Sequence, residues 1–199
     1  MSTSVSAVFR ELVAERLRGI AELTDAQADA LESHYNLLNK WNRTLNLTAI
    51  RELDEIVERH YCESIFLAAH VPAGTLRIAD IGSGAGFPGL PIAIYRADCR
   101  VTLLESHQRK AVFLKEAARA LQNVRVLARR AEQVNEEFDV AVSRAVSYSD
   151  LAASLKALAP AAVLLTGAED PPDELGFVWE PAIPLPWGKQ RYLRMGRRS

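Results

Sequence analysis

Apolar and polar positions follow a helical period in the first third of the chain. Over residues 5–17, 23–42 and 52–70, apolar side chains recur every three or four positions, which predicts three amphipathic helices. Thr24 followed by Gln27 three residues later is the pattern of a capping box, so the second helix should begin there. The third predicted helix ends before a proline and carries acidic residues in its first turn, where the helix dipole favours them.

From residue 76 the pattern changes to short apolar runs separated by amphipathic segments. The runs predict five buried strands, at residues 76–82, 99–106, 124–129, 138–143 and 161–167. Helices are predicted between them: one from Pro88 to about Tyr95, one over 107–121, and one over 149–159 with its start at Ser149 and Asp150. This alternation predicts a parallel sheet with helices on both faces. The proline-rich tail predicts loop with one or two short strands, the last ragged and near residues 190–195.

Composition places the chain among ordinary globular proteins. It has 199 residues, 49% hydrophobic and 25% charged, enough for one domain with a small appendage. No apolar run reaches about 18 residues, and charges interrupt the N-terminal segment, so we expect a cytoplasmic protein with no membrane segment. Cys62 and Cys99 lie far apart without zinc-type spacing, which predicts two reduced thiols and no metal site.

Four glycines fall within residues 80–91, directly after the first predicted strand. A glycine-rich turn between strand and helix brings backbone N–H groups close to a ligand, as in nucleotide-binding folds. Phe87 stands where a dinucleotide fingerprint would have its third glycine. The glycines instead follow Asp80 in a D-x-G-x-G-x-G spacing, which resembles the cofactor loop of S-adenosylmethionine-dependent methyltransferases. No phosphate-binding P-loop motif occurs.

Glu105 ends the second predicted strand, where a carboxylate can accept hydrogen bonds from both ribose hydroxyls. NAD-dependent enzymes bind their ribose in the same way. Glu105 therefore indicates an adenosyl ligand but does not distinguish NAD from S-adenosylmethionine. S-adenosylmethionine carries a carboxylate, which helix N-terminal amides can bind, and a sulfonium, which a nearby acid such as Asp80 can favour.

The residues after the fourth predicted strand constrain the acceptor atom. The motif typical of exocyclic amine methylation is absent there, and the strand leads into Arg144 and Ala145. Neither cysteine stands where carbon methylation would require a nucleophile. A ring nitrogen has a free lone pair and no proton to lose, so positioning supplies most of the catalysis. The absence of an obvious general base therefore favours a ring-nitrogen acceptor.

Several motifs together resemble one family. In order along the chain they are "NLLNKWNRTLNLTAI", "VERHYCES", "RIADIGSGAGFPGLPIAI", "VTLLES", "FLKE" and "VSRAV". They resemble the bacterial 16S ribosomal RNA guanine-N7 methyltransferases, the glucose-inhibited division protein B family. The resemblance implies an α/β, Rossmann-like class I methyltransferase sheet over residues 71–199 with an α-helical extension over residues 1–70. It also implies methylation of N7 of one guanine, guanosine 527, in the decoding-region loop of 16S rRNA.

The expected cofactor-binding residues combine the glycine loop with positions that the resemblance implies. They are Gly82, Ser83, Gly84, Phe87, Glu105, Ala131, Glu132 and Arg144. We hypothesise that Glu132 holds the adenine amino group. Arg144 has three interpretations: a cofactor contact, an RNA-phosphate contact, or an ion pair at a strand end. Asn42, Asn46 and His60 match family positions beside the site and either contact the target base or RNA, or only bond to local backbone. No catalytic residue is assigned; Arg144, Asn46 and His60 are the candidates.

Charge is unevenly distributed although the net charge is −1. Residues 1–70 carry a net −4 and residues 71–168 a net +3, while Gly188 to Ser199 hold five basic residues and no acid. The partner implied is 16S rRNA or the small ribosomal subunit, and a monomer is expected. Candidate RNA contacts are Arg109, Lys110, Lys115, Arg119, Arg129, Arg130, Lys189, Arg191, Arg194, Arg197 and Arg198. The tail is favoured because no acid near it in sequence opposes its charge.

Two positions depart from the family pattern, and two other functions stay open. Glu63 stands where aspartate is usual, and Thr166 where a lysine is usual before glycine. The alternatives are a methyltransferase of a small molecule and a nucleotide-binding, NAD-type oxidoreductase.

Overall fold

The three predicted helices form the N-terminal part of a computed structural model that describes residues 5–199. They are α1 (Val5–Arg16), α2 (Asp25–Leu45) and one continuous helical run, in which α3 (Leu53–Ile56) and α4 (Glu63–His70) flank a π-helical segment, Val57–Cys62. The Thr24 hydroxyl accepts from the Gln27 amide, and the Gln27 side chain accepts from the Thr24 amide, so the capping box is confirmed. The π-helical segment has no counterpart in the prediction.

All five predicted strands are present and parallel. They are β1 (Arg77–Ile81), β2 (Arg100–Leu104), β3 (Val124–Leu127), β4 (Val140–Arg144) and β5 (Ala161–Thr166), in the order β3-β2-β1-β4-β5. The carboxyl ends of β1, β2 and β4 therefore meet at one edge, which is where doubly wound sheets bind ligands.

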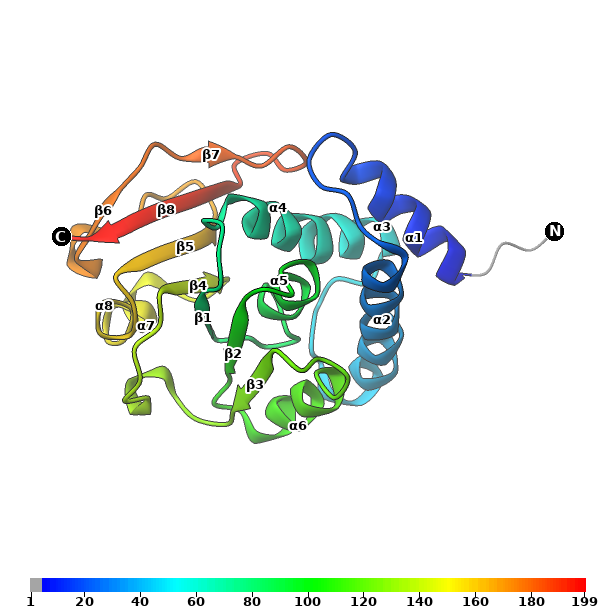
Figure 1. Cartoon of the computed structure of the whole chain (residues 1–199), viewed down its shortest axis with the longest axis horizontal. Coiled ribbons are helices and arrows are strands. Elements are labelled where there is room, and N and C mark those ends of the chain that lie inside the picture. Colours follow the sequence, from blue (N-terminus) through cyan, green and yellow to red (C-terminus); the bar gives the residue numbers. More distant parts are fainter. Residues whose placement is uncertain (1–4) are drawn as a thin grey trace.

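The tail corrects the prediction of a wholly parallel sheet. β8 (Tyr192–Arg198) pairs antiparallel with β5 along six residues, and β6 (Phe177–Trp179) and β7 (Ile183–Pro184) pair antiparallel with β8. The only helical element between β5 and β8 is a three-residue 3₁₀ turn, Asp173–Leu175. Between these two strands there is no crossover helix, which a parallel return of the chain would need. The last strand is continuous rather than ragged (Figure 1).

The helices of the sheet domain are shorter than predicted. They are α5 (Gly89–Tyr95), α6 (Gln108–Ala117), α7 (Tyr148–Ala152) and α8 (Leu155–Leu158). The predicted helix over 149–159 is broken into α7 and α8. It also begins earlier than predicted, because the Ser147 hydroxyl, not Ser149, accepts from the Asp150 amide at 3.1 Å. The segment 118–121 continues α6 only as a turn.

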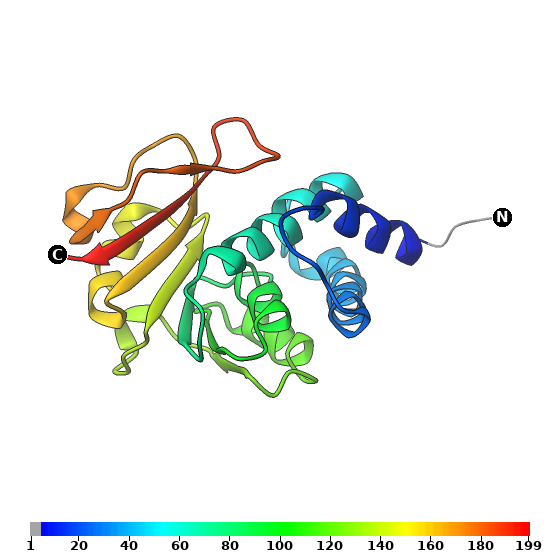
Figure 2. The same cartoon turned by 45° about the horizontal axis from the view of Figure 1, so that its top comes forward.

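The core has a layer on each face of the sheet. Ile78, Leu103 and Val142 point to the face covered by the N-terminal helices, α5 and α6, whereas their neighbours along the strands pack under α7 and α8. Phe9 and Leu38 of the extension belong to the first layer, so the apolar core is continuous across residue 70. Figure 2 shows the extension packed beside the helices of that layer.

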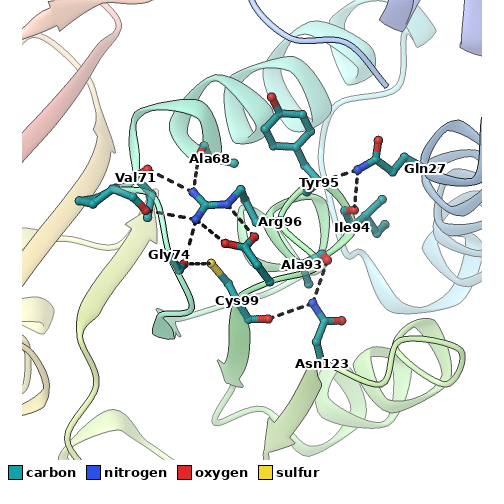
Figure 3. Close-up of polar contacts among 12 residues, drawn as sticks. Gln27, Ala68, Val71, Gly74, Ala93, Ile94, Tyr95, Arg96, Cys99 and Asn123 are labelled. Atoms are coloured by element: carbon teal, nitrogen blue, oxygen red, sulfur yellow. Dashed lines mark hydrogen bonds and ion pairs between the residues drawn. The ribbon is translucent and has the colours of Figure 1, made fainter. Parts of the chain in front are cut away.

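Arg96 anchors the connection from α4 to β1 at the amino ends of the strands (Figure 3). Its guanidinium donates to the carbonyls of Val71, Pro72 and Gly74 at 3.1 Å each and pairs with Asp98. These bonds satisfy backbone carbonyls of the loop that follows α4. They fix the helical run that carries His60 toward the opposite edge of the sheet.

Both cysteines are buried and unpaired. Across residues 5–199, no helix is both long and apolar enough to cross a membrane. In the same part of the chain, no three His, Cys, Asp or Glu side chains gather into a metal-binding group.

Candidate cofactor and substrate site

The glycine loop after β1 requires its glycines for two separate reasons. Gly82, Gly84 and Gly86 have positive φ angles of 72°, 55° and 91°, which L side chains rarely adopt. A β-carbon on Gly82 would lie 2.6 Å from a methyl carbon of Val146, and one on Gly86 would lie 2.4 Å from Leu90. The bare backbone is therefore needed for the turn and for close packing against the neighbouring loop and helix.

Asp80 is buried under this loop and ties it to the first turn of α5. Its Oδ2 accepts from the Gly89 amide at 3.0 Å, and the Ser83 hydroxyl donates to its backbone carbonyl at 3.0 Å. Burial raises the pKa of Asp80 to about 7. The side chain is 0% exposed, so its place in the structure is beneath the loop rather than on the ligand-facing surface.

His34 connects the helical extension to the same loop from the other side. Its Nε2 lies 3.0 Å from the carbonyl oxygen of Ala85, which can only accept, so Nε2 carries the proton. Nδ1 then accepts from the Tyr61 hydroxyl, 3.1 Å away. Burial lowers the pKa of His34 to about 4, which keeps the ring neutral. The extension thus supports the loop through a satisfied, uncharged hydrogen-bond chain.

Glu105 lies at the carboxyl end of β2 and faces the glycine loop. Its Oε2 accepts from the Gly84 amide at 2.9 Å and its Oε1 from the His107 amide at 2.7 Å. Each carboxylate oxygen keeps further acceptor capacity, so both ribose hydroxyls can still donate to it.

Glu105 lines a cleft of about 230 Å³, the sheet-edge cleft. The sequence-predicted residues that line it are Gly82, Glu105, Ala131 and Glu132, together with Arg129 and Arg130. The first four are thus brought together as expected for one ligand. Arg129 and Arg130, predicted as RNA contacts, lie at the same cleft.

A second cleft of about 180 Å³, the extension cleft, adjoins the first, since Gly82 and Val146 line both. Its predicted residues are Gly82, Ser83, Gly84, Phe87, His60 and Arg144. Leu47 and Thr48 of the extension also line it and are absent from the predicted site. Their place in the "WNRTLNLT" motif, next to the predicted Asn46, is the signal in the sequence that could have found them.

His60 lies in the extension cleft with its ring stacked on Phe87, the ring centroids 4.5 Å apart. Its Nε2 is 2.8 Å from the hydroxyl oxygen of Thr48, which also accepts from the Ile50 amide. Burial, reinforced by the nearby Arg144 charge, lowers the pKa of His60 to about 2. His60 is therefore a neutral side chain held in place by stacking and one hydroxyl contact.

Arg144 is the other polar side chain of this cleft. It donates to the backbone carbonyl of Arg59 and lies over the Phe87 ring, with its Cζ 5.5 Å from the centroid. No carboxylate in residues 5–199 forms an ion pair with it, which removes the ion-pair interpretation. Burial lowers its pKa to about 10, so it is still charged at neutral pH. The charges of Glu63 and Asp80 act on it from beyond ion-pair distance. A desolvated guanidinium without a direct ion-pair partner can still take an anionic ligand.

The two asparagines have different roles. The Asn42 amide donates to the Thr48 carbonyl and its oxygen accepts from the Thr48 amide, both at 3.0 Å, which closes the turn after α2. Asn46 is the left-handed C-cap of α2, with φ 45° and an exposed side chain at the rim of the extension cleft. Asn42 therefore bonds local backbone, while contact between Asn46 and RNA stays a prediction.

The tail is not free of acids once folded, which corrects the reason for favouring it. Arg191 forms a two-pronged ion pair with the buried Glu63, its Nε lying 2.6 Å from Oε1. Arg194 is buried and pairs with Asp170. Both acids lie outside the basic segment Gly188–Ser199 in sequence. The candidate RNA contacts that are left exposed are Arg109, Lys115, Arg119, Arg129, Arg130, Lys189, Arg197 and Arg198, with Lys110 half-buried.

Comparison with known proteins decides the family. A protein-family model described as rRNA small subunit methyltransferase G matches residues 27–164. The chain belongs to this family. A ribosomal RNA small subunit methyltransferase G of Chromobacterium violaceum is 43% identical over 142 residues, covering 67% of this chain and 68% of the relative. The protein of the same name from Nitrosospira multiformis is 42% identical over 146 residues, covering 69% and 66%.

Solved structures agree on the fold. A SAM-dependent methyltransferase from Aquifex aeolicus superposes with a TM-score of 0.57 at 13% identity, covering 73% of this chain and 93% of that chain. Magnesium protoporphyrin IX methyltransferase from Synechocystis, with bound SAM, gives 0.55 at 13% identity, covering 100% and 99%. The class I methyltransferase fold is thus confirmed. Membership of the methyltransferase family confirms S-adenosylmethionine as the cofactor. The NAD-type alternative is wrong.

Proposed function

We propose that this protein transfers a methyl group from S-adenosylmethionine to N7 of a guanine in 16S rRNA, with guanosine 527 as the family target. The observation that carries the proposal is the meeting of two clefts at Gly82. One presents the Glu105 carboxylate, and the other presents Phe87, His60 and Arg144. The relatives at about 40% identity are named as methyltransferases of small-subunit ribosomal RNA.

The residues of the sheet-edge cleft fit the cofactor. Glu105 would hold the ribose hydroxyls, and the segment at Ala131 and Glu132 would meet the adenine. The backbone at Gly82 lines the junction of the two clefts. When bound, S-adenosylmethionine supplies an electrophilic methyl group on its sulfonium. The unpaired Arg144 guanidinium would bind either the methionine carboxylate or an RNA phosphate, and both interpretations stay open.

The residues of the extension cleft suit a ring-nitrogen acceptor. N7 of guanine needs no general base, and His60 cannot serve as an acid at neutral pH because its pKa is about 2. Methylation leaves the guanine positively charged, and a neutral imidazole adds no further positive charge beside it. The Phe87 ring lies beneath the His60 ring and under the Arg144 guanidinium, and so holds both side chains in place. The chain's contribution is thus orientation and a tolerant electrostatic environment.

The test uses labelled methyl donor and small ribosomal subunits from a strain lacking this modification. The proposal predicts label in a single guanine of 16S rRNA, recovered as 7-methylguanosine. Label in another base would overturn the acceptor assignment. Label recovered only in a low-molecular-weight fraction would support the small-molecule alternative instead.

Four further features are proposed. Residues 1–70 would form a helical extension to a methyltransferase domain over 71–199. The protein would act in the cytoplasm, where ribosomal RNA is found, as a monomer and without a metal. Light scattering of the purified protein tests the monomer, and retention of methyl transfer in a chelator tests the last point.

A further inference from the structure

The end of α2 carries a basic stretch that the net charge of the extension conceals. From Leu37 to Arg51 the sequence has three basic residues and no acid, although residues 1–70 together carry −4. α2 ends at Leu45, the chain reverses at Asn46, and the next two residues, Leu47 and Thr48, line the extension cleft. The fold therefore brings this stretch to the rim of the site.

Lys40, Arg43 and Arg51 are exposed, and none has an ion-pair partner within residues 5–199. By contrast, Arg10 and Arg16 in the same extension pair with carboxylates. Exposed basic side chains without ion-pair partners, next to a cleft, suit a polyanionic partner.

The basic surface continues onto the sheet domain. The Trp41 ring contacts the Phe113 ring edge-on, with centroids 5.9 Å apart, and Phe113 lies on α6 one turn after Arg109. Figure 1 shows the end of α2 beside α6. Lys40, Trp41, Arg43, Arg51 and Arg109 lie at the end of α2, in the loop after it and at the start of α6, and we group them as the α2–α6 surface.

We propose that the α2–α6 surface binds the phosphates of the RNA strand that flanks the target guanine. The proposal rests on the proposed function and names how its substrate is held. Lys40 and Asn46 are separated by about 9 Å along the helix axis, at ~1.5 Å per residue. Stacked nucleotides rise about 3.4 Å each, so the contacts fall within about three nucleotides of the base in the cleft.

Arg43 also has a local interpretation, because a cation in the last turn of a helix stabilises the helix dipole. That role would affect folding stability and leave the salt dependence of RNA binding unchanged. Salt dependence is therefore the readout that separates the two.

The test compares Arg43→Gln with Arg51→Gln against a control that removes two other exposed, unpaired charges, Arg18→Gln with Arg100→Gln. Affinity for small subunits lacking the modification is measured by filter binding over a range of salt concentrations. The slope of log affinity against log salt should fall by about 2 in the test variant, roughly one for each phosphate that is no longer neutralised. The control should keep the wild-type slope. Both variants should keep the increase in Tm caused by S-adenosylhomocysteine.

A test-variant slope equal to that of wild type overturns the proposal, and so does an equal fall in the control. Failure of the proposed function is seen separately in the wild-type protein. If wild type binds subunits but labels no guanine, and the slope falls in the test variant, the surface stands and the acceptor assignment fails.

Discussion

Replacing Arg191 with methionine should destabilise the protein strongly, because Glu63 would be left buried without its partner. The Glu63 side chain is 0% exposed, and both of its carboxylate oxygens accept from the Arg191 guanidinium. Removing one member of such a pair typically costs about 3–5 kcal/mol. In a protein of this size that corresponds to a fall in Tm of roughly 6–20 °C.

The pH dependence of the variant gives an independent check. Burial already raises the pKa of Glu63 above its ordinary value of 4.5, and Arg191 is the main influence that lowers it. Without Arg191 the folded-state pKa rises further above the unfolded one. Below about pH 4.5, Glu63 of the variant is protonated in both the folded and the unfolded state, so its burial costs least there. As the pH rises through the new folded-state pKa, the variant loses this stability. Lowering the pH from 8 to 5 should recover part of the loss.

Urea unfolding followed by tryptophan fluorescence measures these effects. The matched control is Arg197→Met, an exposed position on β8, the strand that follows Arg191, which should change the free energy of unfolding by less than about 0.5 kcal/mol. The double variant with Glu63→Met and Arg191→Met should return to within about 1–2 kcal/mol of wild type, because apolar replacement of a buried pair is often neutral. An Arg191→Met protein as stable as wild type would refute the reasoning and restore Arg191 as a candidate RNA contact.

Three further predictions concern the site and the tail. Gly82→Ala should lower stability by about 1–3 kcal/mol in thermal unfolding, because its β-carbon meets Val146 at a positive φ; an unchanged Tm would contradict this. Glu132→Ala should weaken S-adenosylhomocysteine binding in calorimetry, and an unchanged Kd would show that Glu132 does not hold the adenine. Arg197→Gln with Arg198→Gln should reduce the salt dependence of subunit binding by up to about 2 if the tail contacts phosphates; an unchanged slope removes the tail from the RNA surface.

Local patterns were sufficient for the parallel strands and the glycine loop. Strands β1, β2, β4 and β5 are apolar runs buried along most of their length, whereas the edge strand β3 is half-exposed. The spacing of Gly82, Gly84 and Gly86 after β1 is itself the requirement for the turn. The position of Glu105 beside the glycine loop could be predicted because the carboxyl ends of parallel strands meet at one edge of the sheet. These features depend on residues close together in sequence.

The break between α7 and α8 and the π-helical segment are local features that the pattern missed. The other errors involve residues far apart in sequence. Glu63 and Arg191 are 128 residues apart, so the charge of the tail could not be balanced against acids elsewhere. The direction of β8 depends on the segment between it and β5 rather than on its own pattern. Trp41 contacts Phe113 only because α2 and α6 pack together. The net charge of residues 1–70 averages over the basic end of α2 and the acidic segments around it.

A crystal structure with S-adenosylhomocysteine tests the central claim most directly. The account predicts its ribose hydroxyls on the Glu105 carboxylate, its adenine beside Ala131 and Glu132, and its sulfur at the junction of the two clefts by Gly82. Density for the ligand at any other place, with the cleft beside Glu105 empty, would contradict it.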